Sequence, residues 1–306
     1  MALRFTLRQL EYFVSVGEEG SILQASQKMN VSSPSISVAI GQLETELGIK
    51  LFARKHAHNL SLTQAGRQFM TQANRVLSES EAVMRLASSI SDSVQGPLKV
   101  GCLLTFAQLI LPSLRRQFED QYPQVTISQS ELNQTGIFDH LRRAQIDIAV
   151  TYDLSIPKDI TFIPIAELPP YVMLSEAHPL AHLDAVSAAQ LREYPMVLLD
   201  LPHSSGYFLS YFGHAGGPPE IAEKTRDMAV LQSLVANGFG YSIVNTRTLN
   251  DRAPDGAPLK FVPLADPLRS MFIGVALIKE MANVLVVEAF VEHCKANIAK
   301  TVLLSG

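Results

Sequence analysis

The sequence predicts an α/β protein with a small all-α winged helix-turn-helix head at its N-terminus. Two patterns predict this fold class. Helix-capping residues and helical apolar spacing fill residues 6–48, whereas from Leu98 onward short apolar runs alternate with helical stretches. Gly96-Pro97 interrupts the chain between the two patterns, so we place a domain boundary there. With 306 residues, the chain is long enough for about two domains.

Three helices are expected in the head, each opened by a hydroxyl-bearing residue. Thr6 and Ser21 are both followed three residues later by Gln, which is the spacing of a capping box. Ser32 precedes a third helix that carries Pro34 in its first turn, where a missing N–H costs nothing, and that ends at Gly48. Two short helices joined by a tight turn form the helix-turn-helix arrangement.

The outer face of the third helix is small and uncharged, whereas a solvated helix face is usually rich in Lys and Glu. Small side chains allow close approach to a DNA groove, Gln42 could read adenine, and Val38 could contact a thymine methyl group. A merely solvent-facing surface is the alternative.

Residues 50–62 could then form a two-stranded wing whose basic tip reaches phosphates. The residues expected at DNA are Ser21, Ser33, Pro34, Ser37, Val38, Gln42, Arg54 and Lys55.

A long helix capped by Thr63 is expected to run to about Ser91. From Phe69 to Ile90 its apolar and small residues recur in steps of four and three, the spacing of a coiled-coil seam. Because DNA readers of this type pair across two-fold sites, the pattern favours a dimerising helix. Packing of this helix against a core is the alternative.

The body beyond Gly96-Pro97 is expected to contain parallel sheets, because strands alternate with helices there. Ligands of such sheets bind beyond the carboxyl ends of the strands. The expected strands are Leu98–Leu103, Val125–Leu132, Ile146–Thr151, Tyr171–Leu174, Met196–Leu199 and Tyr241–Val244, with a helix at Met228–Ala236.

Composition and charge narrow the class of protein. Residues 1–77 carry eight Lys and Arg against five Asp and Glu, while the rest carry 17 against 24, so a basic head adjoins an acidic body. Cys102 and Cys294 are few for a secreted chain, and no signal peptide or long apolar run occurs, so a soluble cytoplasmic protein without membrane contact is expected. No catalytic, cofactor or metal motif stands out, which argues against an enzyme.

Cys102 lies on an apolar strand, where its thiol is expected to pack in the core and not to react with oxidants.

The N-terminal run resembles the LysR-type transcriptional regulators, and the spacing of the matching segments is preserved throughout. Those segments are Leu7–Phe13, Gly20–Ile22, Val31–Ser37, Gln42–Glu44, Leu47–Arg54 and Leu62–Gly66. The resemblance is weaker in the body, where the matching segments are Leu111-Pro112, Tyr122-Pro123, Ile146-Asp147, His178–Ala181 and Leu234–Gly238. It covers essentially the whole chain.

The resemblance implies a winged helix-turn-helix, a dimerising linker helix, and an effector domain of two α/β subdomains like a periplasmic binding protein. It also implies binding to promoter DNA, a small-molecule effector in the cleft between the subdomains, assembly as a homodimer or homotetramer, and RNA polymerase as a further partner. The implied domains are residues 1–65 for DNA binding, 66–95 for the linker helix and hinge, and 96–306 for the effector domain. Its subdomains would be 97–165 with 268–306, and 166–267, with crossover strands near Phe162–Leu168 and Pro267–Ile273.

Two residues depart from the family pattern. Many members carry Gln at the position of Ser33 and Arg at that of Val38. Without that Arg, the strongest guanine reader is lost, so more weight on A·T contacts is expected.

The effector cleft is expected to bind a small carboxylate, aromatic in view of Phe106 and Tyr152, because helix N-termini favour anions. Asp227 opposes this by favouring a cationic group, unless Arg226 neutralises it, so the charge of the ligand stays open. The residues expected to line the cleft are Thr105, Phe106, Asn133, Gln134, Tyr152, His203, Ser204 and Asp227.

Two other classes of protein fit part of the pattern. A solute-binding protein or an enzyme on the same α/β pair would show a signal peptide or a catalytic cluster, and neither is visible. A DNA-binding architectural protein without small-molecule input would leave the long α/β body unexplained.

Overall fold

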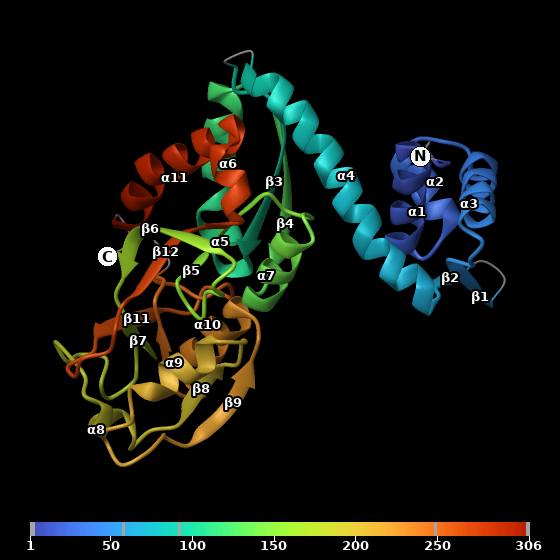
Figure 1. Ribbon diagram of the computed structural model, residues 1–306. Helices are drawn as coiled ribbons and strands as arrows, with labels where there is room; N and C mark the ends of the chain where they lie inside the picture. The colour runs from blue at the N-terminus through green and yellow to red at the C-terminus, as the bar shows by residue number, and fades with distance from the viewer. Residues whose placement is uncertain (1–3, 57–58, 91–92, 248–249, 304–306) are drawn as a thin grey trace. The chain divides into compact units, whose positions relative to one another are not determined.

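The computed structural model describes residues 4–56, 59–90, 93–247 and 250–303. The chain divides into two compact units, one of residues 1–91 with 143–145 and the other of residues 92–142 with 146–306, and each is described by itself (Figure 1). No helix among the described residues is both long and apolar enough to cross a membrane.

The first unit has the three expected helices followed by a two-stranded antiparallel hairpin. Each predicted cap is confirmed: Thr6, Ser21 and Ser32 accept a hydrogen bond from the backbone N–H three residues on. Gly20 and Gly48 end two of the helices in the left-handed conformation that glycine adopts without strain. The elements are α1 (Leu7–Glu19), α2 (Ile22–Met29), α3 (Ser33–Leu47), β1 (Phe52–His56) and β2 (Asn59–Leu62).

Aromatic side chains from three elements form the core of this unit. Phe13 of α1 lies 5.4 Å from the ring of Phe52 and 5.2 Å from that of Phe69 on the long helix α4 (Gln64–Ile90). Thr63 caps α4 as predicted, because its Oγ1 accepts a hydrogen bond from Gly66 N at 2.9 Å. These contacts fix the hairpin and the start of α4 onto the helix-turn-helix.

The proposed seam of α4 changes character along the helix. Ala73 is buried, whereas Val76 is 43% and Val83 66% exposed. The side chains of Ala87 and Ile90 lie outside the described residues. Pairing of this helix with a second copy therefore stays a prediction.

The first subdomain of the second unit is built on a five-stranded sheet of order β4-β3-β5-β12-β6. Its strands are β3 (Gly96–Leu103), β4 (Val125–Leu132), β5 (Ile148–Tyr152), β6 (Thr161–Leu168) and β12 (Met271–Leu277). Its helices are α5 (Leu104–Leu109), α6 (Leu111–Gln121), α7 (Gln134–Arg142) and α11 (Leu285–Leu303), with the 3-10 turn η1 (Lys279–Asn283). Helices α6 and α11 pack together, with the rings of Phe118 and Phe290 edge to face at 5.1 Å.

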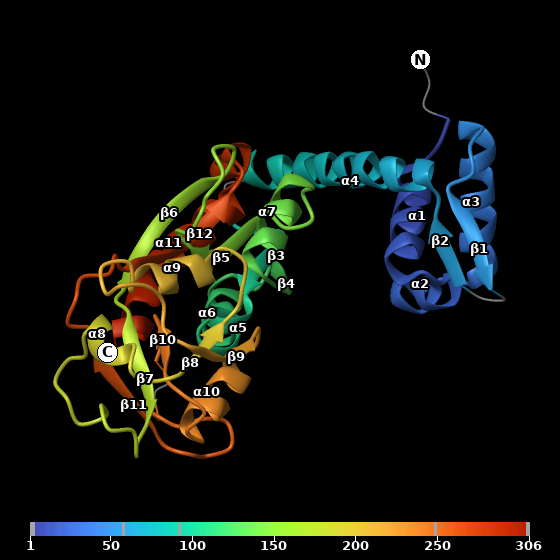
Figure 2. The same ribbon diagram turned by 90° about the horizontal axis from the view of Figure 1, so that it is seen from below.

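The second subdomain is inserted between β6 and β12. It holds an antiparallel sheet of order β10-β7-β11 and a parallel pair β8-β9, with α10 packed on β8 (Figure 2). Its elements are β7 (Tyr171–Ser175), α8 (Ala188–Leu191), β8 (Met196–Leu199), α9 (Ser204–Ser210), β9 (Ile221–Thr225), α10 (Met228–Ala236), β10 (Ser242–Val244) and β11 (Leu259–Pro263).

The parallel pairing predicted from sequence is confirmed for β3 with β4 and β5 and for β8 with β9. It is wrong for β7, which pairs antiparallel with both neighbours. Only Pro169-Pro170 separates β6 from β7, so no crossover helix sets the direction of β7. The second crossover strand begins at Met271 and not near Pro267, since proline has no N–H for a sheet ladder.

Candidate functional site

Helix α3 buries one face and exposes the face expected to meet DNA. Ile36, Ile40 and Leu43 are buried in the unit, whereas Ser37 and Gln42 are exposed and Val38 is 59% exposed. A Cβ atom placed on Gly41, also on this face, would have nothing within 4 Å. The exposed strip therefore carries no charge and leaves the helix backbone close to its surface.

Several of the expected DNA-facing residues also have contacts within the unit. Ser33 is half-buried and its Oγ donates to Ser26 Oγ of α2 at 2.9 Å, so its hydroxyl joins the two helices. Gln42 Oε1 accepts a hydrogen bond from Gln9 Nε2 at 3.3 Å, which holds the amide on the exposed strip. Ser21 caps α2, and Pro34 is exposed in the first turn of α3.

The hairpin is joined to α3 by the buried carboxylate of Glu44. This group accepts hydrogen bonds from Leu51 N at 2.8 Å and Phe52 N at 3.2 Å, and it pairs with Lys50 Nζ at 2.6 Å. Burial alone would raise the pKa of Glu44, but these hydrogen bonds outweigh it and lower the pKa. The side chains of Arg54 and Lys55, expected at the tip, lie outside the described residues.

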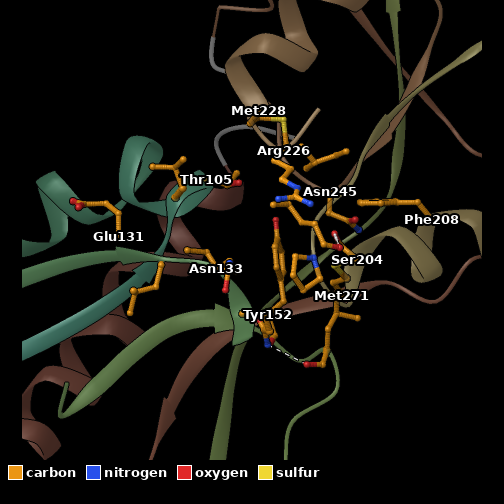
Figure 3. Close-up of a pocket in the computed structure, with 18 residues that line it drawn as sticks. Thr105, Glu131, Asn133, Tyr152, Ser204, Phe208, Arg226, Met228, Asn245 and Met271 are labelled. Carbon is orange, nitrogen blue, oxygen red and sulfur yellow. Dashed lines mark hydrogen bonds between the residues drawn. The ribbon is translucent and has the colours of Figure 1, made fainter. Parts of the chain in front are cut away.

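A cavity of about 310 Å³ lies between the two subdomains of the second unit (Figure 3). It opens beyond the carboxyl ends of β3, β4 and β5 on one side and β8 and β9 on the other, where the sequence predicted a ligand site. The lining is mainly apolar, and its members are Leu103, Leu104, Thr105, Glu131, Leu132, Asn133, Gln134, Tyr152, Leu154, Leu199, Leu201, Pro202, Ser204, Phe208, Arg226, Met228, Asn245 and Met271.

Five of the eight expected cleft residues line this cavity and three do not. Phe106 is fully buried beneath it, with its ring 4.6 Å from that of Tyr152. Asp227 instead caps α10, where its Oδ1 accepts hydrogen bonds from Ala229 N and Val230 N. His203 lies outside the lining, with Nε2 3.4 Å from Thr135 Oγ1. The five that line it are Thr105, Asn133, Gln134, Tyr152 and Ser204.

The polar groups after β4 are already bonded within the protein. Gln134 donates to the carbonyls of Tyr152 and Leu154 at 3.1 and 3.0 Å and accepts from Thr151 Oγ1 at 2.6 Å. Asn133 Oδ1 accepts from Gly136 N at 2.8 Å and so caps α7. These internal bonds remove much of the reason for expecting an anion at this helix N-terminus.

Tyr152 forms part of the cavity wall with a neutral phenol. Burial raises its pKa first, and the nearby Tyr207 raises it further, although a hydrogen bond with Thr246 acts in the opposite direction. Burial likewise raises the pKa of the Cys102 and Cys294 thiols, which favours the inert role expected for Cys102. Among the described residues no cluster of three or more metal-ligating side chains occurs.

Sequence reasoning missed the cavity's two most informative polar residues, Arg226 and Asn245. Arg226 extends into the space between Thr105 and Asn245 (Figure 3). Within the part of the chain that the structure describes, it forms no ion pair, so it does not neutralise Asp227 as the sequence suggested. Arg226 follows β9 directly, and this position at the end of a strand was the available signal. No feature of the sequence around Asn245 indicated that this residue would line the cavity.

Comparison with known proteins finds two family models on this chain. The model described as "Bacterial regulatory helix-turn-helix protein, lysR family" matches residues 7–67, and "LysR substrate binding domain" matches residues 91–299. A curated relative, the HTH-type transcriptional regulator BsdA of Bacillus subtilis, is 30% identical over 78% of this chain and 83% of its own length.

Solved structures of similar proteins cover nearly the whole chain. The crystal structure of HinK, a LysR family transcriptional regulator from Pseudomonas aeruginosa, has 31% identity and a TM-score of 0.65 over 97% of this chain and 99% of its own. Full-length CbnR complexed with its target DNA has 25% identity and a TM-score of 0.69 over 95% and 99%.

Proposed function

The chain belongs to the LysR family of transcriptional regulators, and from this premise we propose that a small apolar carboxylate, held in the 310 Å³ cavity by Arg226, controls its binding to promoter DNA. Members of this family are DNA-binding regulators with an effector-binding domain, and not enzymes. The protein acts in the cytoplasm as a homodimer or homotetramer that pairs through α4 and signals to RNA polymerase.

The proposal that the ligand is a carboxylate depends on one observation. The cavity wall is mainly apolar, and Arg226 brings into it a guanidinium that pairs with no carboxylate of the described residues. A guanidinium matches a carboxylate in bidentate geometry, and apolar walls bury the rest of a small ligand. Glu131, the acidic residue of the lining, is exposed and accepts from Gln129 Nε2, so it lies at the rim.

The DNA-reading role rests on α3 and on the basic head. The exposed strip of Ser37, Val38 and Gln42 is small and uncharged, which suits close approach to a major groove and readout of A·T pairs. For pairing of two copies, the exposed Val76 and Val83 on α4 supply apolar surface. Two-fold pairing would place two α3 helices on successive half-sites.

Replacing Arg226 by Gln is expected to weaken binding of a monocarboxylate roughly tenfold or more, because a hydrogen bond to a charged group contributes about 1.5–3 kcal/mol. Isothermal titration of the full chain with a panel of small aromatic and aliphatic monocarboxylates measures this. Arg226→Lys should recover part of the affinity, since it keeps the charge but loses the bidentate geometry. The control Lys260→Gln, an exposed cation on β11 away from the cavity, should bind as the wild type does. Unchanged affinity in Arg226→Gln would remove the carboxylate proposal.

Replacing Gln42 by Ala is expected to weaken binding to the specific promoter by about 1–3 kcal/mol while sparing non-specific DNA, since one bidentate base contact is lost. Gel-shift titrations on the protein's own upstream region and on a scrambled duplex at one salt concentration measure both affinities. Gln68→Ala, an exposed glutamine on α4, is the matched control. An equal loss on both duplexes would show that Gln42 reads no base.

A further inference from the structure

Asn245 is a buried polar side chain of the cavity that lacks one of its hydrogen-bond partners. It follows β10, is 4% exposed, and lines the cavity on the wall opposite Thr105 (Figure 3). Its Oδ1 accepts no hydrogen bond from the described residues. A buried acceptor without a donor is costly, so buried amides are normally satisfied on both atoms.

The orientation of the Asn245 amide is fixed by its other atom. Nδ2 donates to the Leu168 carbonyl at 2.8 Å and to Tyr207 Oη at 3.2 Å. A carbonyl oxygen only accepts hydrogen bonds, so the nitrogen must face Leu168 and the oxygen must face away. Turning the amide over would set two acceptors against each other. Oδ1 is therefore the one atom of this amide that is left to accept a bond from a ligand.

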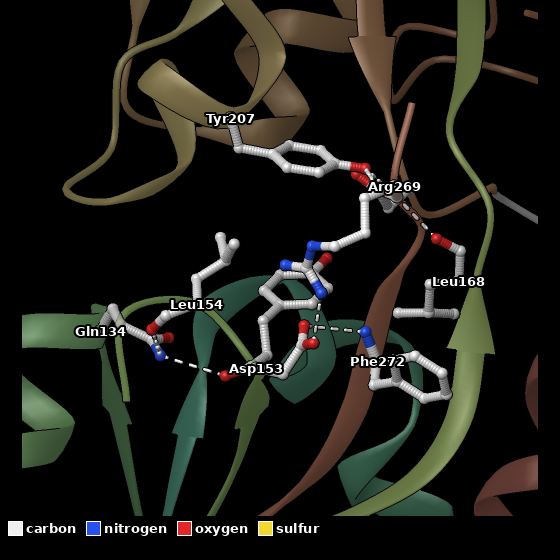
Figure 4. A network of polar contacts seen from close by, with 9 residues as sticks. Gln134, Asp153, Leu154, Leu168, Tyr207, Arg269 and Phe272 are labelled. Carbon is white, nitrogen blue, oxygen red and sulfur yellow. Dashed lines mark hydrogen bonds and ion pairs between the residues drawn. The ribbon is translucent and has the colours of Figure 1, made fainter. Parts of the chain in front are cut away.

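The groups that hold Asn245 belong to the connections between the subdomains (Figure 4). Leu168 ends the outgoing strand β6, and Tyr207 Oη donates to the carbonyl of Arg269 at 2.6 Å, just before the returning strand β12. Arg269 in turn pairs with Asp153 Oδ2 at 2.6 Å, while Asp153 Oδ1 accepts from Phe272 N at 2.9 Å. This bonding anchors the amide firmly.

We propose that the ligand of this cavity donates a hydrogen bond to Asn245 Oδ1, so that Asn245 selects an apolar acid that also carries a hydroxyl or N–H group. The inference rests on the proposed function, because it takes the cavity to be the effector site with Arg226 as partner of the acid. An acid with only acceptors at the Asn245 end leaves Oδ1 unsatisfied and is disfavoured. The ligand is thus bifunctional: one end anionic, the other a donor.

Matched probe pairs test the donor requirement on the wild-type full chain. The probes are the hydroxybenzoates and hydroxyphenylacetates, each compared with the fluoro compound of the same substitution pattern, which is similar in size and has no proton to donate. At least one hydroxyl probe should bind roughly tenfold or more tightly than its fluoro partner, the factor expected from satisfying one buried acceptor. Isothermal titration measures both affinities, and their quotient is the hydroxyl-to-fluoro ratio. This comparison needs no variant.

Two substitutions then locate the donor's partner. Asn245→Leu removes the acceptor at similar volume and should bring the hydroxyl-to-fluoro ratio close to one. Tyr207→Phe removes a neighbour of Asn245 but leaves Oδ1 in place, so its ratio should stay near the wild-type value. Retention of promoter DNA in a gel shift and the far-ultraviolet circular dichroism spectrum verify that each variant is folded.

The outcomes separate this inference from the proposed function. Equal binding of hydroxyl and fluoro probes overturns the donor requirement while upholding a carboxylate site. A ratio that persists in Asn245→Leu shows that another residue reads the donor and likewise overturns it. Binding of no probe of either kind to the wild type overturns both the carboxylate proposal and this inference.

Discussion

Replacing Gly66 by Ala is expected to destabilise the DNA-binding unit by roughly 3 kcal/mol or more and to abolish promoter binding at micromolar protein concentration. A Cβ atom on Gly66 would lie 2.1 Å from the Leu51 carbonyl oxygen and 3.1 Å from its carbon, both backbone atoms. The start of α4 and the entry to the hairpin would have to separate, and the buried Leu51 would move with them. Hydrogen exchange measured by mass spectrometry on peptides from α1–α3 of the full chain reports this loss.

Gly41→Ala is the matched control for Gly66→Ala. Gly41 is also a helical glycine of the same unit, but its Cβ would meet nothing within 4 Å. Alanine there should slow hydrogen exchange in α3, because it stabilises a helix by about 0.5–1 kcal/mol over glycine. Opposite signs for the two substitutions are expected. Equal and small effects would show that α4 does not pack on Leu51 as the structure has it.

Replacing Glu44 by Ala is expected to cost about 2–4 kcal/mol of stability in the same unit. The N–H groups of Leu51 and Phe52 would lose their acceptor at a largely buried site, and each unsatisfied donor costs about 1–3 kcal/mol. Glu44→Gln keeps an oxygen for these donors and should cost about 1 kcal/mol. Hydrogen exchange at the first residues of the hairpin is the measurement. A loss as large in Gln as in Ala would assign the effect to the Lys50 pair.

The stability of the wild type and of Glu44→Gln is expected to depend differently on pH. The pKa of Glu44 is lowered on folding from its ordinary value of 4.5. Its contribution to stability is therefore complete above about pH 4.5 and is lost as the pH falls through the lower folded value. The wild type should lose stability over this acid window more steeply than Glu44→Gln, which has no group to protonate there. Parallel acid profiles of the two proteins would contradict the assignment.

The head of the protein was predicted well because its signals are local. Thr6, Ser21, Ser32 and Thr63 cap the helices that the sequence assigned to them, and Gly48 ends α3. A cap depends on a residue and a backbone N–H about three positions away, so a single sequence contains both partners. The exposed strip of α3 followed from the same helical spacing.

The ligand cavity was predicted only in part, because its partners are distant in the chain. Thr105 and Ser204 were placed at it by the rule that ligands lie beyond strand ends. The same rule misplaced Asp227, whose carboxylate caps α10 instead of facing the cavity. The same side chain can cap a helix in one orientation or contact a ligand in another. Which orientation it takes depends on the residues that surround it in the folded protein.

The sequence by itself determined the helix-turn-helix and the family, and it predicted a ligand site at the carboxyl ends of strands, where the structure has a cavity. The tertiary structure alone decided which polar groups of that site are available. Gln134 looks available in sequence but is bonded to Thr151, Tyr152 and Leu154, whereas Asn245 has no local signal and keeps an unsatisfied oxygen. The physical reason is that hydrogen-bond saturation is a property of atoms brought together across 17 to 77 residues of chain. No local pattern encodes it.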